Sequence, residues 1–263
     1  MAGDLVISTI NGQAIGTKNV IIDGNFNVNQ RGVSGTVTLA AGAYGHDRWK
    51  GGASGCTYTF ATVANVTTLT ISAGSLIQVV EGLNLQSDTY TLSFSGTAQG
   101  KINGGSYSAS GVTGTATGGT NLNVEFNTGT LSLVQLEKGS TDTSFDYRPY
   151  GTELALCQRY YAKIVSDSSY TAFASGYLST TTNIVTSIQY PQTMRASPTL
   201  TILNCGVFVN TGSVISATAS TVYYGKNSAN ASFTLGSAGT ANAGAILVAN
   251  NNVNAYIDYS AEL

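Results

Sequence analysis

The residue best suited to acid–base chemistry is the single histidine of this 263-residue chain, His46, which Asp47 follows directly. A serine–histidine–aspartate triad would have to use this pair, and it also needs a nucleophile held at hydrogen-bond distance. The sequence contains no GxSxG nucleophile elbow, no GxxxxGK phosphate loop and no GxGxxG fingerprint. One histidine also excludes sites built from several histidine ligands. We therefore interpret His46 as a turn residue and predict no catalytic residue and no enzymatic activity.

Acidic side chains offer a second kind of chemistry, because two facing carboxylates hydrolyse glycosidic bonds. The candidates in the first half of the chain include Glu81, Asp88, Glu125 and Glu137, and nothing in their spacing singles out a pair. The loop at residues 23–27, with sequence DGNFN, offers oxygen ligands that are mostly neutral amides, a weak set for calcium. We predict that this loop caps a turn, and that the protein uses no metal and no cofactor.

The cysteines, the basic residues and the apolar runs of the chain argue against several other classes of protein. Cys56, Cys157 and Cys205 form no CxxC pair, which favours buried apolar thiols over a zinc or redox site. Only 11 Lys and Arg residues are present, scattered along a chain of net charge −2, which argues against nucleic-acid binding. No run of about 18 apolar residues predicts a transmembrane helix. The N-terminus has no signal-peptide pattern, so we expect synthesis in a cytoplasm.

Apolar and polar residues alternate with a period of two along much of the chain, the pattern of strands with one buried and one wet face. Residues 56–60, 90–94 and 122–126 show it most clearly, and in residues 90–94 the threonine and serine face is the wet one. Glycine-rich turns separate the runs, and no helix of three turns is evident. Residues 153–161 begin as one helical turn and end as a strand. The sequence predicts an all-β fold of antiparallel sandwiches.

Three regions follow from these patterns. Residues 1–19 form a separate N-terminal segment, with a short strand over 5–10 and a turn at 11–12. Residues 20–150 suffice for one jelly roll, which ends where Pro149 and Gly151 interrupt the pattern. Residues 151–263 are predicted to form a second, smaller β-sandwich of about seven strands. Its strand-like segments are Ile184–Tyr190, Pro198–Leu203, Val214–Tyr224, Ala231–Leu235, Ala245–Ala249 and Asn254–Tyr259.

Several motifs, in order along the chain, resemble those of bacteriophage tail-fibre and tail-associated proteins. The N-terminal one is similar to the pattern NGNF-x-V-x-QRG, and later ones to DRW, Q-x-IEG, VQLE-x-G, FEYRP, ELALCQRYY and MRA-x-PT. The matching segments are Asn19–Gly32, His46–Trp49, Ile77–Gly82, Val134–Gly139, Phe145–Pro149, Glu153–Tyr161 and Met194–Thr199. One departure is Asn29, where the family often has tryptophan.

The resemblance implies a virion structural protein with a jelly roll like that of carbohydrate-binding modules. Such proteins are commonly homotrimers in a tail fibre, tail tip or other external appendage of the virion. It further implies that residues 1–19 attach the chain to other tail or appendage proteins, and that the projecting part contacts polysaccharide on the host cell surface. Each contact of this kind would be weak, and binding by several copies of the chain at once would raise the overall avidity.

A sugar site would need flat aromatic rings beside hydrogen-bonding groups. The carbohydrate-binding candidates are Tyr44, Trp49, Tyr58 and Tyr107. Core packing is the competing interpretation, and it is favoured for Trp49 because a lone tryptophan in a sandwich usually fills the core. Two alternative functions stay open: a fibre-borne polysaccharide depolymerase, and a carbohydrate-binding module detached from a hydrolase.

Two smaller expectations concern side-chain placement. Arg31 and Arg148 are each expected to pair with Glu137 or Asp47, which would pin together the ends of the first domain. Tyr160 and Tyr161 are expected on alternate faces of a strand, so that one of them is exposed.

Overall fold

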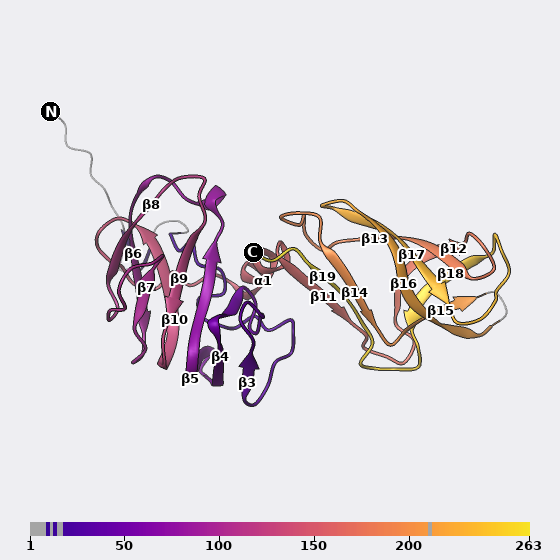
Figure 1. Ribbon diagram of the computed structural model, residues 1–263, viewed down its shortest axis with the longest axis horizontal. Helices are drawn as coiled ribbons and strands as arrows, with labels where there is room; N and C mark the ends of the chain where they lie inside the picture. The colour runs from indigo at the N-terminus through magenta and orange to yellow at the C-terminus, as the bar shows by residue number, and fades with distance from the viewer. Residues whose placement is uncertain (1–8, 11–12, 15–17, 210–211) are drawn as a thin grey trace. The chain divides into compact units, whose positions relative to one another are not determined.

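The computed structural model describes residues 9–10, 13–14, 18–209 and 212–263. The chain divides into two compact units, which we call unit 1 (residues 1–157 with Leu263) and unit 2 (residues 158–262). Nearly all regular structure is β-strand, which confirms the predicted all-β class in its coarse form (Figure 1). The predicted N-terminal strand and turn fall largely outside the described residues. In this region the structure describes two strands of two residues each, β1 (Thr9–Ile10) and β2 (Gln13–Ala14), which pair antiparallel.

Unit 1 is an antiparallel sheet that divides into two layers. Its strands are β3 (Val37–Leu39), β4 (Trp49–Val63), β5 (Val66–Val80), β6 (Asp88–Ser95), β7 (Gly100–Ile102), β8 (Val112–Ala116), β9 (Leu122–Phe126) and β10 (Gly129–Lys138), with a 3₁₀ turn η1 (Gly82–Asn84) after β5. The long strand β5 pairs with β10 through residues 69–71 and with β9 through residues 76–80. One layer therefore continues as β10–β6–β8 and the other as β9–β7.

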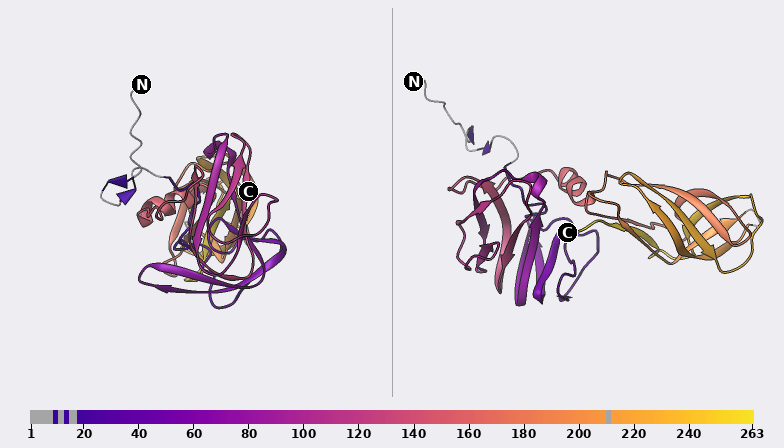
Figure 2. Two further views of the ribbon diagram at one scale, coloured as in Figure 1. Left: turned by 90° about the vertical axis from the view of Figure 1, so that its left-hand side faces the viewer. Right: turned by 45° about the horizontal axis from the view of Figure 1, so that its top comes forward.

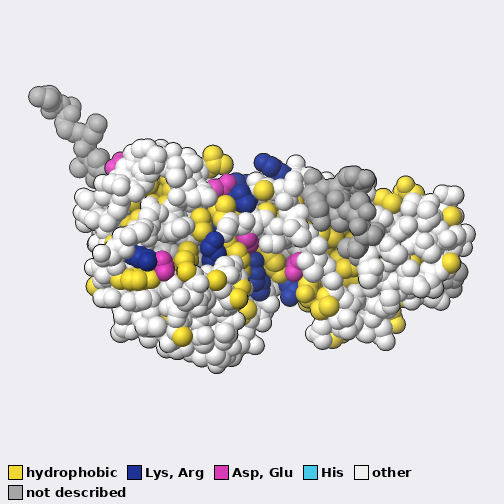
Figure 3. Space-filling view, in the orientation of Figure 1, with side chains coloured by type: hydrophobic (Ala, Val, Ile, Leu, Met, Phe, Trp, Pro, Cys, Tyr) yellow, Lys and Arg dark blue, Asp and Glu magenta, His cyan; other side chains and the backbone are white. Residues whose placement is uncertain are grey.

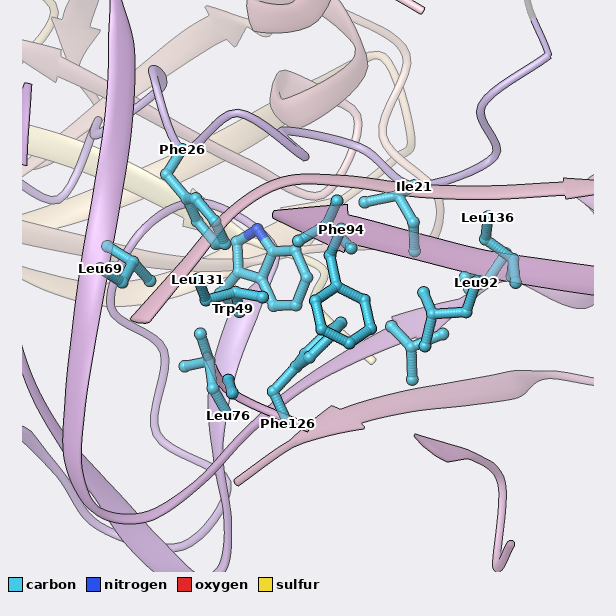
Figure 4. Packing of buried hydrophobic residues seen from close by; sticks show 14 of the residues in the cluster. Ile21, Phe26, Trp49, Leu69, Leu76, Leu92, Phe94, Phe126, Leu131 and Leu136 are labelled. Carbon is cyan, nitrogen blue, oxygen red and sulfur yellow. The ribbon is translucent and has the colours of Figure 1, made fainter. Parts of the chain in front are cut away.

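The two layers enclose a dense aromatic core. Phe94 of β6 packs edge to face on Phe126 of β9, with ring centroids 5.0 Å apart. Trp49, the only tryptophan of the chain, is fully buried among these rings and the leucines around them (Figure 4). Its Nε1 donates to the backbone oxygen of Asp23 at 2.9 Å, so the polar edge of the indole is satisfied inside the core.

Unit 1 ends with the α-helix α1 (Tyr150–Gln158). Pro149 stops the preceding extended segment, and its carbonyl accepts from the backbone N–H groups of Thr152 and Glu153 as the helix begins. The expected single helical turn is thus a helix of nine residues. In the part of the chain that the structure describes, no helix has the length and apolar character to span a lipid bilayer.

Unit 2 combines a closed barrel with a small sheet. The barrel order is β12 (Ala172–Leu178), β13 (Asn183–Gln189), β17 (Ser228–Leu235), β16 (Val214–Tyr224), β15 (Cys205–Val209) and β18 (Gly244–Ala249), which pairs back to β12 (Figure 2). The three-stranded sheet has the order β11 (Tyr161–Val165), β19 (Tyr256–Ser260) and β14 (Thr199–Leu203). The predicted C-terminal β-sandwich is therefore corrected: the six predicted strands are present, but the sheet closes on itself.

Two expectations about exposed faces are wrong. Thr91 and Ser93 of β6 are buried, because the segment after β10 covers this face, and Thr91 Oγ1 donates to the oxygen of Gly139 at 2.7 Å. Tyr160 and Tyr161 are both buried as well. Strand β11 begins only at Tyr161, so the two side chains do not follow the alternation of one strand.

Candidate functional site

The motif residues of unit 1 form a network of buried polar groups. At its N-terminal end, Asn19 accepts with Oδ1 from the backbone N–H groups of Ile21 and Leu136, and its Nδ2 donates to the oxygen of Val134 at 3.0 Å. Gln78 of β5 forms two hydrogen bonds with the backbone of Ile22, at 2.9 and 2.7 Å. These side chains dock residues 19–22 onto β10 and β5, because buried backbone groups need partners.

A buried charged group connects this segment to the end of unit 1. Arg148 Nε lies 2.8 Å from Glu153 Oε2, and its two terminal nitrogens donate to the backbone oxygens of Asn19 and Ile21. Glu153 Oε1 in turn accepts from the backbone N–H of Asp23. The expected role of Arg148 in joining the ends of the domain is therefore confirmed, but its acidic partner is Glu153 rather than Glu137 or Asp47.

The carboxyl group of Asp23 lies at the centre of this network. Its Oδ1 accepts from the backbone N–H of Val28 at 2.9 Å, the predicted turn-capping role. Burial, followed by the nearby charges of Asp47 and Glu153, raises the pKa of this carboxyl well above its usual range, against the opposing effect of the Val28 hydrogen bond.

The carboxylates of Asp47 and Glu137 hold two further connections. Asp47 accepts from the backbone and side-chain nitrogens of Gln30, and the expected pair with Arg31 is confirmed at 3.5 Å. Glu137 accepts from the backbone N–H and the hydroxyl of Thr143 at 2.7 and 2.8 Å. These contacts fix the loops that contain Gln30 and Thr143 and commit both carboxylates to internal partners.

His46 is enclosed in the same region. Its Nδ1 lies 2.9 Å from the hydroxyl of Tyr58, and the ring packs edge to face on Phe60 with centroids 4.6 Å apart. Burial lowers the pKa of His46 to about 4, so the ring is neutral at physiological pH. The carboxylate of the adjacent Asp47 makes the contacts with Gln30 and Arg31 given above.

An open cleft of about 650 Å³ lies at the edge of this network, entirely within unit 1. The segment after Asp23, the ends of β4 and β5, and the loop leading into α1 form its walls. The tight turn between β4 and β5, in which Ala64 and Asn65 have positive φ, brings Thr62, Asn65 and Thr67 to the cleft. The lining consists of amide, hydroxyl, aromatic and buried charged groups: Asn25, Phe26, Asn27, Asn29, His46, Phe60, Thr62, Asn65, Thr67, Tyr147, Arg148, Pro149, Tyr150 and Glu153.

None of the four predicted sugar-binding residues lines this cleft. Trp49 and Tyr58 are fully buried and present no ring face to a ligand. Tyr44 and Tyr107 are half-buried, and cations lie over both rings: the Cζ atom of Arg31 is 5.1 Å from the Tyr44 centroid, and Lys101 Nζ is 4.4 Å from that of Tyr107. The four side chains are therefore not brought together into one aromatic surface.

The candidate carboxylates have separate partners. Asp88 pairs with Lys138 at 3.1 Å on the surface. Glu125 pairs with Lys101 at 3.0 Å and accepts from the hydroxyl of Tyr107 at 2.8 Å. Burial opposes ionisation of Glu125, but hydrogen bonds from Ser75, Lys101 and Tyr107 outweigh it and lower the pKa.

The three cysteines are free and buried, as the sequence predicts. Burial raises the pKa of the Cys56 and Cys205 thiols to about 11.

Sequence reasoning did not single out the two exposed aromatic residues of the cleft, Tyr147 and Tyr150. Tyr147 is 54% exposed and Tyr150 is 59% exposed, on either side of Pro149. Two tyrosines around a proline in a domain-terminal loop were the available signal, because loops commonly carry binding residues.

The comparisons with known proteins add no relative. No model of a protein family matches the chain, and no curated protein or solved structure is significantly similar to it.

Proposed function

We propose that this chain is a non-enzymatic structural protein of a bacteriophage virion, part of a tail fibre or another tail appendage. The observation that carries the proposal is that the motifs resembling tail proteins coincide with the buried network of unit 1. Asn19, Asp47 and Arg148 hold backbone or side-chain groups from segments at least 17 residues away, and Glu137 holds the loop that follows β10. Such groups are costly to replace, so a shared scaffold explains why these residue types recur together.

The finer fold assignment belongs to the same proposal. The two layers of unit 1 are compatible with a jelly roll of the carbohydrate-binding-module type. Residues 1–19 attach the chain to other virion proteins, and units 1 and 2 form the projecting part. Charged side chains are few on the face that Figure 3 shows, and most of that face is neutral, which favours close packing of several copies without repulsion.

One surface of unit 2 supports self-association of the chain. Phe208 of β15 and Ile246 of β18 are direct cross-strand neighbours that point out of the barrel, 43% and 37% exposed. With Tyr170, which is 56% exposed, they line a hollow of about 590 Å³. Exposed apolar groups gathered in this way are typical of contact surfaces between proteins.

The oligomeric state of the purified full chain tests this proposal, measured by light scattering during size-exclusion chromatography. We expect a trimer that Phe208→Ser weakens and that Val253→Ser, a change at an exposed apolar residue outside the hollow, leaves intact. A strictly monomeric chain would favour the detached carbohydrate-binding module instead.

A second measurement addresses the place of the protein in a virion. Antibodies against the chain, used with immunogold electron microscopy, should label the tails of phage particles that encode it. Labelling absent from intact particles would contradict the proposal. Release of new reducing ends from host polysaccharide by the purified chain would favour the depolymerase.

A further inference from the structure

The carboxyl group of Asp23 is enclosed in unit 1 with only part of its bonding capacity used. The residue is 0% exposed. Its Oδ1 accepts from the backbone N–H of Val28 at 2.9 Å, whereas among the described residues its Oδ2 has no hydrogen-bond partner. An ionised carboxylate loses the solvation of both oxygens on burial, and only donors or cations at both oxygens compensate for that loss. A protonated, neutral carboxyl fits this environment better.

The charges that act on the Asp23 carboxyl are negative. Asp47, in the loop before β4, and Glu153, on α1, both oppose its ionisation. Glu153 pairs with Arg148 at 2.8 Å, and Asp47 lies 3.5 Å from Arg31. These two cations therefore stand beside the other two carboxylates. An ionised Asp23 would add a further negative charge in a buried region, where repulsion between like charges is strong.

The ionisable groups around Asp23 come from the loops before β4 and α1, from β4 and from α1. They are Arg31, His46, Asp47, Arg48, Tyr58, Arg148, Glu153 and Cys157. Burial lowers the pKa of His46 to about 4, raises that of Tyr58 to about 12 and raises that of the Cys157 thiol. These three groups are thus neutral near pH 7. The guanidinium of Arg48 donates to the backbone oxygen of Val79 at 2.7 Å.

Asp23 also holds the start of unit 1 in place through its backbone. Its N–H donates to Glu153 Oε1, and its oxygen accepts from Trp49 Nε1 at 2.9 Å. Its carboxyl fixes Val28 five residues further along the chain. A change of charge at this carboxyl therefore acts directly on the contacts that dock residues 19–30 onto the rest of unit 1.

We propose that Asp23 is a proton-coupled lock. In the folded chain its carboxyl keeps a proton well above the pH at which an exposed aspartate ionises, and undocking of residues 19–30 releases that proton to the solvent. Rising pH therefore favours the undocked form. The inference goes beyond the structural role proposed above and does not depend on it, because it rests on residues of unit 1 alone.

Proton linkage gives the direction of this effect. Burial, followed by the charges of Asp47 and Glu153, raises the pKa of Asp23 in the folded chain above its ordinary value of 3.8, against the hydrogen bonds from the backbone of Val28 and Asn27. The stability that the proton contributes is therefore complete below pH 3.8 and is lost as the pH rises toward the folded pKa.

Carbon-13 NMR of the full chain, labelled at the aspartate carboxyl carbons, tests the protonation. At about pH 6 we expect the Asp23 resonance at the position of a protonated carboxyl. It is assigned by through-bond correlation to the Asp23 backbone, so the assignment needs no variant. Asp88 is the matched control, because it is exposed, and hydrogen bonds from the Thr89 backbone and from Lys138 lower its pKa. An ionised Asp23 at this pH would overturn the proposal, whatever group then satisfied its Oδ2.

Hydrogen exchange tests whether the proton controls docking. From about pH 5 to pH 7, exchange of the amides of residues 21–30 in the wild type should accelerate relative to Asp23→Asn. We expect about a tenfold change in this ratio for each pH unit below the folded pKa. The ratio removes the base catalysis that is common to all amides. Asp88→Asn should exchange at the wild-type rate throughout. A ratio of wild type to Asp23→Asn that stays constant over this range would refute the lock.

Discussion

The burial of His46 predicts a specific loss of stability in acid. The ring lies among Tyr58, Phe60 and Phe26, with 1% of its surface exposed, and the hydroxyl of Tyr58 at 2.9 Å is its polar neighbour. Burial lowers the pKa from 6.5 to about 4. Protonation in the folded state would place an imidazolium among aromatic rings, away from the water that would solvate it.

The direction and size of the effect follow from proton linkage. Above pH 6.5 the histidine is neutral in both states and contributes no pH dependence. As the pH falls below this value, the unfolded chain takes up a proton that the folded chain refuses, so stability declines until the pH reaches the folded pKa. The gap between 6.5 and about 4 corresponds to about 3 kcal/mol of unfolding free energy.

Trp49 provides the assay, because the only tryptophan of the chain is buried in the same core and its fluorescence reports the unfolding of unit 1 alone. Urea unfolding near pH 7 and near pH 4.5 should show a larger loss of stability for the wild type than for His46→Gln, by about 2–3 kcal/mol. Carboxyl groups titrate in both proteins, so their contribution cancels in the difference. Equal losses in the two proteins would refute a buried, neutral histidine.

Two further substitutions test the network. Gly24→Ala would bring a Cβ to 2.1 Å from the oxygen of Val134, so we expect thermal denaturation to show a loss of about 1–3 kcal/mol, while Gly104→Ala, with open space at its Cβ, should cost less than about 1 kcal/mol. Arg148→Met would leave the buried carboxylate of its partner unpaired and should cost about 3–5 kcal/mol in urea unfolding. Lys138→Met breaks an ion pair that is about half exposed, and a loss as large as that of Arg148→Met would contradict the distinction between buried and surface pairs.

The strand pattern was predictable because alternation records which side of each strand is buried. Residues 184–190 were predicted as a strand, and β13 covers Asn183–Gln189. The predicted strand stops at Leu203, and β15 was missed because Asn204 alone, with a φ of 53°, separates it from β14. One left-handed residue makes no recognisable turn motif, so the sequence contains no sign that a second strand follows at once.

Barrel closure was not predictable, because inward and outward residues alternate identically in a sandwich and a barrel. The structure closes because β12 pairs with both β13 and β18, and β12 has the weak sequence AFASGYL. Its small side chains give little strand signal, so the strand that closes the barrel was not predicted from the sequence.

The candidate site depended on contacts between distant segments. Asn25, Asn65 and Tyr150 are far apart in the sequence. They line one cleft only because the β4–β5 turn and the loop before α1 fold against residues 25–29. Two of the four aromatic residues favoured from the sequence, Trp49 and Tyr58, lie on β4 and point into the core. Alternation predicts the faces of a strand, but it carries no information about which loops approach one another.

The distribution of charge explains why the motifs of the sequence coincide with the buried network of unit 1. The chain has 13 acidic and 11 basic residues. Six of these charged side chains are buried in the described structure, namely Asp23, Asp47, Arg48, Glu81, Glu137 and Glu153. All six lie in unit 1, and each belongs to a motif that resembles tail proteins. Charged residues thus specify the internal connections of unit 1, where an unpaired partner would be costly.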